Sequence, residues 1–171
     1  MNGQSQAAEN FVKRIFTFLD ETDSQQLAPL VQWFQPAGCK IIVNASAFAQ
    51  AAGFLETWQR CVVQTQHVVT AVDFHVIPGT GSAVCSVNGK VRFDESGRDK
   101  AGQDAAVPAA AGTGATPAAP VGKHRPLWGP YFGLSLQLVV DERALGGDFN
   151  GVISSFNYTM VYRPEDSLMA V

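Results

Sequence analysis

The amino-acid sequence predicts an α+β fold, in which N-terminal helices pack on a long curved antiparallel sheet. Up to about residue 61, apolar residues recur mostly at helical spacing. A short run at 40–44, rich in β-branched residues, interrupts that spacing and is typical of a buried strand. Beyond residue 62 the pattern changes to the alternation of strands, and this order of helices followed by strands indicates the fold class.

Three helices are predicted in the N-terminal part. Residues 9–20 form the first, whose buried stripe consists of Phe11, Val12, Ile15, Phe16 and Leu19. The second is short, because Pro29 must either start it or kink it, and its apolar positions are Leu27, Leu30, Val31 and Phe34. The third runs from Ser46, a suitable N-cap, to about Cys61.

Four long strands are predicted after residue 62. The first two span 63–77 and 82–93, and the turn-forming residues 78–81 between them indicate a hairpin. The other two span 130–141 and 149–163, where a pair of glycines at 146 and 147 permits the chain to return. We therefore expect two hairpins that together build one sheet.

The segment between the two hairpins has a composition of its own. It contains AAVPAAAGTGATPAAP, which is uncharged and has almost no side chain to bury, so it cannot offset the entropy lost on ordering. We predict a single domain over residues 1–171 with a flexible insertion at about 95–125. Lys123, His124 and Arg125 form a basic edge at its end and are candidates for contact with RNA or the ribosome.

Composition and motifs exclude several classes of protein. The 12 Lys and Arg against 15 Asp and Glu give a net charge of −3, which argues against tight binding of nucleic acid by this chain alone. No apolar run approaches the roughly 20 residues of a membrane span, so we expect no membrane insertion. Cys39, Cys61 and Cys85 match no zinc pattern and are predicted to be reduced and buried. We expect no metal, no cofactor and no catalytic site, because none of the corresponding motifs occurs.

One face of the last two strands is predicted to bind a partner. Even-numbered positions there are bulky and apolar, so they face the helices, and the odd-numbered positions face outward. The outward set mixes small apolar residues, Ile153 among them, with uncharged polar ones and lacks the Lys and Glu of a solvated sheet, although such a composition also fits an ordinary exposed face. We call the following predicted contact residues the outer face: Ser135, Gln137, Val139, Ser155, Asn157, Thr159 and Val161.

His67, Asp73 and His75 are the candidates for acid–base chemistry. All three have odd numbers within strand 63–77, which predicts that they lie on one face. At roughly 3.3 Å per residue, His67 is about 20 Å from Asp73, so only Asp73 and His75 are neighbours. Such a pair is more typical of a surface ion pair or a partner contact than of catalysis.

Six strings of the sequence resemble a known family. They are LVQWFQP, CKIIVNASAFAQA, VVQTQHVVTAVDFHVIPGTG, VNGKVRFDESGRDKAGQDA, RPLWGPYFGLSLQLVVDER and DFNGVISSFNYTMVYRPEDSL. Together they resemble the small subunits of fungal messenger-RNA export receptors, which have the cone-shaped nuclear transport factor 2-like fold. The resemblance covers about residues 9–168 and departs mainly at the N-terminus and at 104–122.

The resemblance implies a noncatalytic subunit of a heterodimer that acts in the nucleus and at the nuclear pore and shuttles to the cytoplasm. Its partner would be the nuclear transport factor 2-like domain of a larger receptor subunit, docked on the outer face. The heterodimer would bind phenylalanine-glycine nucleoporin repeats, carry messenger ribonucleoprotein and assist export of the pre-ribosomal large subunit.

Two alternatives remain open on sequence grounds. A homodimeric transport factor that carries a small GTPase would use the same outer face. A cone-fold isomerase or dehydratase would use Asp73 and His75 as its acid–base pair. The homodimer is distinguished by self-association, and the enzyme requires a sheltered pocket around Asp73.

Overall fold

Six strands form one mixed sheet in the order β2-β1-β6-β5-β4-β3 in the computed structural model, which describes residues 3–61, 64–95 and 127–162. The long strands are β3 (Thr65–Ile77), β4 (Ser82–Phe93), β5 (Phe132–Asp141) and β6 (Ile153–Tyr162), and each pairs antiparallel with its neighbour. The two predicted hairpins are therefore confirmed, and β4 pairs with β5 to join them.

The short strand β1 (Lys40–Val43) extends this sheet in a way that was not predicted. It pairs parallel to β6, with Ile41 opposite Phe156, and antiparallel to β2 (Ser46–Phe48). Asn44 and Ala45 adopt positive φ angles in the turn between β1 and β2. The predicted helix start at Ser46 is therefore wrong, because Ser46 pairs with Val43 in this small hairpin and the helix begins only at Ala51.

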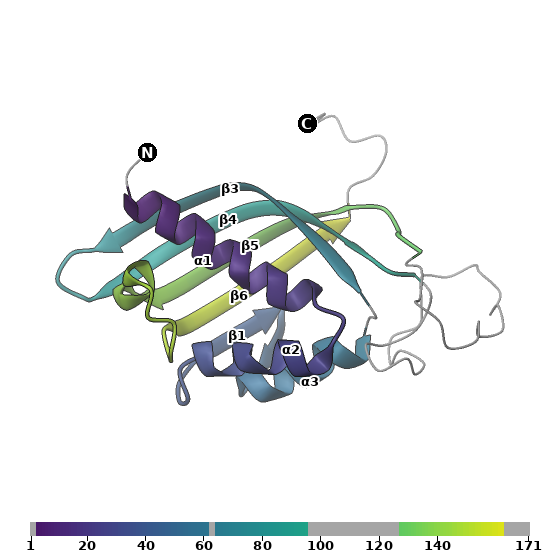
Figure 1. Cartoon of the computed structure of the whole chain (residues 1–171), viewed down its shortest axis with the longest axis horizontal. Helices are drawn as coiled ribbons and strands as arrows, with labels where there is room; N and C mark the ends of the chain where they lie inside the picture. Colours follow the sequence, from purple (N-terminus) through teal and green to yellow (C-terminus); the bar gives the residue numbers. More distant parts are fainter. Residues whose placement is uncertain (1–2, 62–63, 96–126, 163–171) are drawn as a thin grey trace.

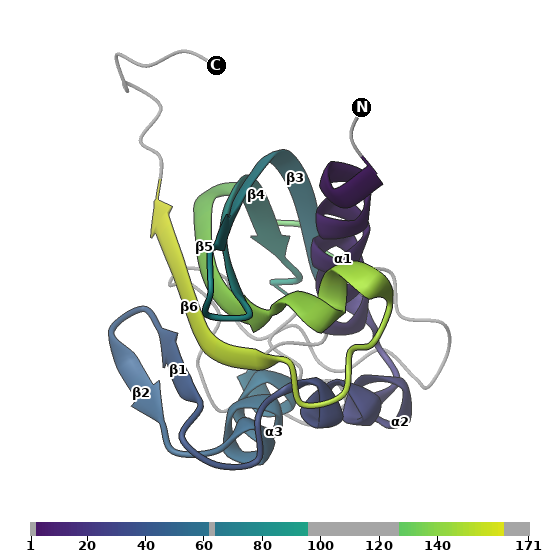
Figure 2. The same ribbon diagram turned by 90° about the vertical axis from the view of Figure 1, so that its left-hand side faces the viewer.

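The helices lie on one side of the sheet. Figure 1 shows α1 (Gly3–Asp20) crossing the long strands, and Figure 2 shows the sheet curving around it, with no described helix on the opposite side. The second predicted helix is divided into α2 (Ser24–Leu27) and the 3₁₀ helix η1 (Ala28–Trp33), with Pro29 in the first turn of η1. Helix α3 (Ala51–Cys61) and the 3₁₀ helix η2 (Glu142–Gly146) complete the order of elements.

The hydrophobic core fills the space between the helices and the inner side of the sheet. All five apolar residues predicted for the first helix are buried there, and so are the even-numbered Leu134, Leu136, Leu138 and Val140 of β5. Phe156 and Tyr158 of β6 are fully buried as well. The predicted assignment of the bulky positions to the helical side is thus confirmed over most of both strands.

Hydrogen bonds join the two segments of the chain that flank the predicted insertion. The amide of Glu95 donates to the carbonyl of Leu127 at 2.8 Å, and the Leu127 amide donates to the buried Asp94 carboxylate at 3.0 Å. Residues 96–126 themselves, including Lys123, His124 and Arg125, lie outside the described residues. The two hairpins thus meet across this junction within one sheet.

Candidate functional site: the outer face of the sheet

The seven residues of the outer face lie together on the side of the sheet that faces away from α1. Direct cross-strand partners pair them as Ser135 with Thr159, Gln137 with Asn157 and Val139 with Ser155. None of the seven is fully buried, and Val161 at the end of β6 is 61% exposed. The register alone brings them side by side, because residues opposite one another in a sheet project to the same face.

Ile153 was predicted to share this face and does not. The pairing of β5 with β6 shifts between Val139 and Val140, so that Val140 lies opposite Ile153 and both side chains are fully buried. Such an irregularity adds a residue to one strand and reverses the side to which the following positions point. The Ser154 hydroxyl at this point donates to the carbonyl of Val139 at 3.0 Å.

The face continues across the neighbouring strands, where most of its residues are uncharged, although the exposed Lys40 of β1 lies opposite Ser155. On β4 the partners of Val139, Gln137 and Ser135 are Val84, Ser86 and Asn88. On β1, Ile42 lies opposite Asn157. Val84 and Val161 are among the exposed large hydrophobic residues of the described part, so this surface combines exposed apolar groups with short neutral polar ones.

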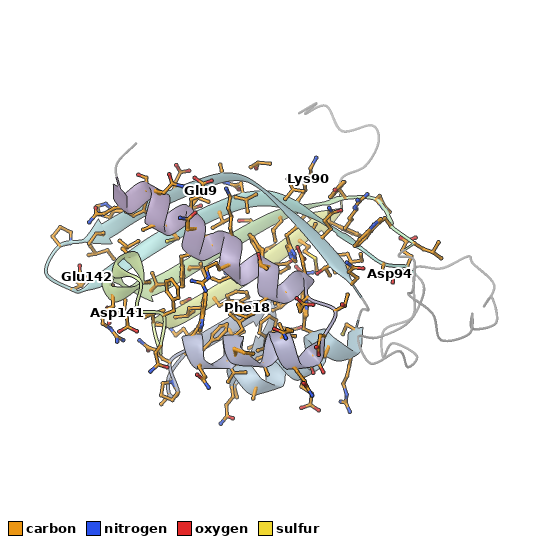
Figure 3. The ribbon with its side chains drawn as sticks, in the orientation of Figure 1. Glu9, Phe18, Lys90, Asp94, Asp141 and Glu142 are labelled. Carbon is orange, nitrogen blue, oxygen red and sulfur yellow. The ribbon has the colours of Figure 1, made fainter. Side chains whose placement is uncertain are left out.

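Positive charge gathers at one end of this surface. The Lys90 ammonium lies 4.7 Å from the centre of the Tyr131 ring, and the Arg92 guanidinium lies 4.7 Å from the Trp128 ring and 5.0 Å from Tyr131. Figure 3 shows Lys90 on the Asp94 side of the sheet, remote from Asp141 and Glu142 at the other end. These cations hold the aromatic rings by cation–π contacts at the rim of the neutral region.

Asp73 and His75 also belong to this open surface. They lie opposite Ser86 and Val84 of β4, and both are exposed. Neither residue lines the two cavities described below. Asp73 and His75 are therefore not sheltered from solvent, as the enzyme alternative requires of its acid–base pair.

His67 lies on the opposite side of the sheet, and its predicted placement beside Asp73 and His75 is wrong. The register of β3 against β4 shifts between Val69 and Ala71, which inserts Thr70 as an extra residue. This bulge reverses the alternation, so that His67 turns into the interior and its side chain is 0% exposed.

The interior holds a chain of hydrogen-bonded polar side chains that was not predicted from the sequence. His67 Nδ1 contacts the Asp20 carboxylate at the end of α1, and Nε2 lies 2.7 Å from the Tyr158 hydroxyl. The Thr65 hydroxyl donates to Asp20 at 2.8 Å, and the His67 amide donates to the other Asp20 oxygen at 3.0 Å. The Phe16 ring stacks on the imidazole with centroids 4.6 Å apart.

This interior chain ties α1 to β3 and β6. Burial, together with the nearby Asp20 carboxylate, raises the pKa of Tyr158 well above its ordinary value. The phenol therefore stays protonated and donates to the imidazole. The three groups resemble an acid–base relay in composition, yet they satisfy one another inside a packed core and line neither of the cavities described below.

Two cavities indent the described surface away from the outer face. One, of about 610 Å³, is lined mainly by the loops around β1 and the start of α3, including Cys39 and Gln50. The other, of about 500 Å³, lies between α1 and η2 and is lined by Arg14 and Phe149 among others. Within the described residues no cluster of three or more metal-ligating side chains occurs.

The sequence as a whole decides the family. Residues 2–171 match the profile of a family described as nuclear pore RNA shuttling protein Mtr2. The chain belongs to the Mtr2 family. It is 57% identical over 170 residues to the mRNA transport regulator MTR2 of Saccharomyces cerevisiae, a match that covers 98% of this chain and 92% of that protein.

Solved structures agree with this family and with the predicted fold. The Mtr2 chain in the crystal structure of the Candida albicans Mtr2–Mex67 M domain complex is 28% identical, with a TM-score of 0.73, covering 96% of this chain and all 100% of that one. Nuclear transport factor 2 from Cryptosporidium parvum is 14% identical, with a TM-score of 0.58 over 91% of this chain and 93% of that chain, a likeness that shows the fold. The predicted nuclear transport factor 2-like α+β cone is thus confirmed.

Membership of the Mtr2 family also bears on whether the protein is a transport factor or an enzyme. The names of the family and of its relatives describe RNA shuttling and the regulation of mRNA transport, not the catalysis of a reaction. The same names connect the family with the nuclear pore. Among the described helices, none has the length and apolar content that a bilayer crossing requires.

Proposed function

We propose that the protein is the small, noncatalytic subunit of a heterodimeric nuclear mRNA export receptor. Its outer face would dock on the nuclear transport factor 2-like domain of the larger subunit, the counterpart of Mex67 in the Candida albicans complex. The observation that carries this proposal is the exposed surface built by Gln137, Asn157 and their neighbours on four strands, which has no charged residue at its centre. An exposed sheet face that lacks charges at its centre is suited to burial against another sheet.

The charged residues at the rim of the surface also support docking through the outer face. Lys90 and Arg92 at one end, Asp73 on β3 and Lys40 on β1 place charges around the neutral centre and not within it. Charges at a rim remain hydrated in a complex, whereas a charge at the centre would lose its hydration without a partner. The arrangement therefore favours one docking orientation at a small desolvation cost.

Substitution of the central residues tests this proposal. The full chain is coexpressed with the nuclear transport factor 2-like domain of the larger subunit, and the mass of the purified product is measured by light scattering. We expect a 1:1 complex for the unchanged protein and its loss for Asn157→Arg or Gln137→Arg, because each places an unpaired charge in the contact. Gln26→Arg, on the exposed surface of α2, is the matched control and should leave the complex intact.

The outcomes also separate the alternative assembly. A 1:1 complex that survives both Asn157→Arg and Gln137→Arg would contradict the assignment of the outer face. The homodimeric transport factor would be favoured by a different result. In that case the protein forms a stable homodimer that does not bind the larger subunit, and the same substitutions dissociate the homodimer. Circular dichroism of each variant establishes that it is folded before its mass is interpreted.

The cargo and pore contacts of the heterodimer extend this proposal. We infer that the heterodimer passes the nuclear pore by weak binding to phenylalanine-glycine nucleoporin repeats, and that it assists export of the large ribosomal subunit. Lys123, His124 and Arg125 stay candidates for RNA or ribosome contact on account of their charge. Neutralising the three should weaken RNA binding by the heterodimer without changing its 1:1 mass, and an unchanged RNA affinity would contradict this assignment.

A further inference from the structure

The cavity between α1 and η2 has a lining that none of the preceding functions uses. It measures about 500 Å³, within the range of roughly 300–1,000 Å³ that is common for binding pockets. Helix α1 contributes polar and cationic side chains at helical spacing, and η2 with the following loop contributes the apolar wall. The lining residues are Ala7, Asn10, Lys13, Arg14, Thr17, Ala144, Leu145, Gly147 and Phe149.

The charge of this lining has one sign. Its only ionisable side chains are Lys13 and Arg14, both cationic, in a chain whose net charge is −3. Lys13 already forms an ion pair with Glu9 one turn earlier on α1. The carboxylates of the nearby loop, Asp141 and Asp148, both pair with Arg143, which does not line the cavity.

Arg14 is therefore the cation in this region that forms no ion pair with a described carboxylate. Its guanidinium lies 5.0 Å from the Phe149 ring and 5.7 Å from the Trp33 ring. Those rings are themselves fixed, since Trp33 and Phe149 lie 4.7 Å apart and Phe11 packs against both. The aromatic contacts orient the planar group, and its residue remains exposed, which leaves N–H donors for a ligand.

Such a site selects a ligand that carries a carboxylate and an apolar group together. A planar guanidinium binds a carboxylate through paired hydrogen bonds, and prior orientation lowers the entropy lost on binding. Leu145 and Ala144 offer an apolar surface beside it. Nucleic acid fits less well, because phosphate backbones are held by many clustered cations and this cavity has one that is unpaired.

We propose that the cavity between α1 and η2 binds a short acidic segment of a partner protein, with an Asp or Glu carboxylate on Arg14 and an adjacent apolar side chain against Leu145. Helix α1 and η2, which line the cavity, lie on the helical side of the sheet, away from the outer face (Figures 1 and 2). Occupation of the outer face by another subunit leaves the cavity open, so this site provides a second, independent contact.

Nuclear magnetic resonance titration of the full ¹⁵N-labelled chain tests the site. The probes are short synthetic peptides that carry Asp-Glu followed by Leu, Phe or Met, and twins in which Asn-Gln replaces Asp-Glu. We expect the acidic peptides to shift the Arg14 Nε–H signal and the amides of Leu145 and Gly147. The twins should bind at least about tenfold more weakly, a difference typical of the loss of a charge-assisted contact.

Two variants and one control make the test specific. Arg14→Gln removes the charge, and Asn10→Glu places a carboxylate one turn before Arg14, where it occupies the guanidinium while favouring the helix. Both should weaken the acidic peptides at least about tenfold, to the level of their amide twins. Arg60→Gln, on the exposed surface of α3 and outside the cavity, should bind like the unchanged protein.

Several results of this titration would contradict the proposed binding of an acidic segment. Equal binding of acidic and amide peptides, binding that Asn10→Glu leaves unchanged in a folded protein, or no shift with any peptide would each overturn the proposal. Arg14-dependent shifts with a single-stranded oligouridine probe but not with the acidic peptides would assign the cavity to RNA instead. None of these results depends on the heterodimer, so failure here is distinguishable from failure of the proposed export function.

Discussion

The imidazole of His67 and the phenol of Tyr158 meet in the interior, with Nε2 and the hydroxyl oxygen 2.7 Å apart. The opposite nitrogen of His67 contacts the Asp20 carboxylate, which can only accept, so Nδ1 donates to it. Nε2 then accepts from the Tyr158 hydroxyl. A helix end and two strands that are separated along the chain are joined by this single line of hydrogen bonds.

Removal of the Tyr158 hydroxyl should therefore destabilise the protein. Tyr158→Phe leaves Nε2 buried without a donor, which is expected to lower the free energy of unfolding by about 1–3 kcal/mol in urea denaturation. Tyr131→Phe is the matched control, since Tyr131 is half-buried at the edge of the sheet, and its change should stay within about 0.5 kcal/mol. Equal losses in the two variants would show that the His67–Tyr158 contact has no special weight.

Trp58 on α3 should be a principal residue of the core. Its side chain is 6% exposed, its ring packs against Tyr158 and Phe54, and Nε1 donates to the Leu19 carbonyl at 3.0 Å. Trp58→Ala is expected to cost about 3–5 kcal/mol, measured by chemical denaturation. Trp128→Ala, at the half-exposed rim of the sheet, should cost clearly less, and a similar loss for both would contradict this role of Trp58.

Gly89 should tolerate no side chain, because β4 passes the bulge of β3 at this point. A Cβ atom added there would lie 2.3 Å from the Val68 carbonyl oxygen, which belongs to the backbone and cannot easily move. Gly89→Ala is expected to lower the free energy of unfolding by about 1–3 kcal/mol.

Gly53 provides the opposite case on α3. It has no atom within 4 Å of an added Cβ, so Gly53→Ala should raise the free energy of unfolding by about 0.5–1 kcal/mol through helix propensity. Thermal and urea denaturation of the two variants measure the contrast. A stable Gly89→Ala protein would show that β3 and β4 are farther apart than described.

The three thiols should differ in reactivity. Cys85 is 1% exposed, and burial raises its pKa from 9.0 to about 11, whereas Cys39 and Cys61 are only half-buried, which corrects the prediction that all three are buried. At pH 8 a pKa of about 11 leaves about a hundredfold less thiolate than the ordinary value of 9.0 does. Partial burial also raises the pKa of Cys39 and Cys61 above 9.0.

Iodoacetamide at pH 8, followed by mass spectrometry of the peptides, measures that difference. We expect Cys39 and Cys61 to be alkylated first and Cys85 to react far more slowly as long as the protein is folded. The rate at Cys85 should rise with pH up to about 11 in the folded protein, since only the thiolate reacts. Early modification of Cys85 would mean that the inner side of β4 is accessible to solvent.

The sequence by itself determined the fold class, the long strands and the side of the sheet to which most residues point. Strand alternation depends on local geometry alone, so Leu136 and Phe156 could be assigned to the core, and Gln137 and Asn157 to the opposite face, from their numbers and chemistry. The helical stripe of α1 is local in the same way.

Tertiary structure decided the positions where that local rule is interrupted. The bulge at Thr70 separates His67 from Asp73 and His75, and the register shift beside Val139 buries Ile153. The parallel pairing of β1 with β6 also joins segments far apart in sequence, and the β1–β2 hairpin at this edge of the sheet moves the helix start from Ser46 to Ala51. Bulges and register arise from how neighbouring strands pair, and that pairing is an energetic property of the assembled sheet which no single strand contains.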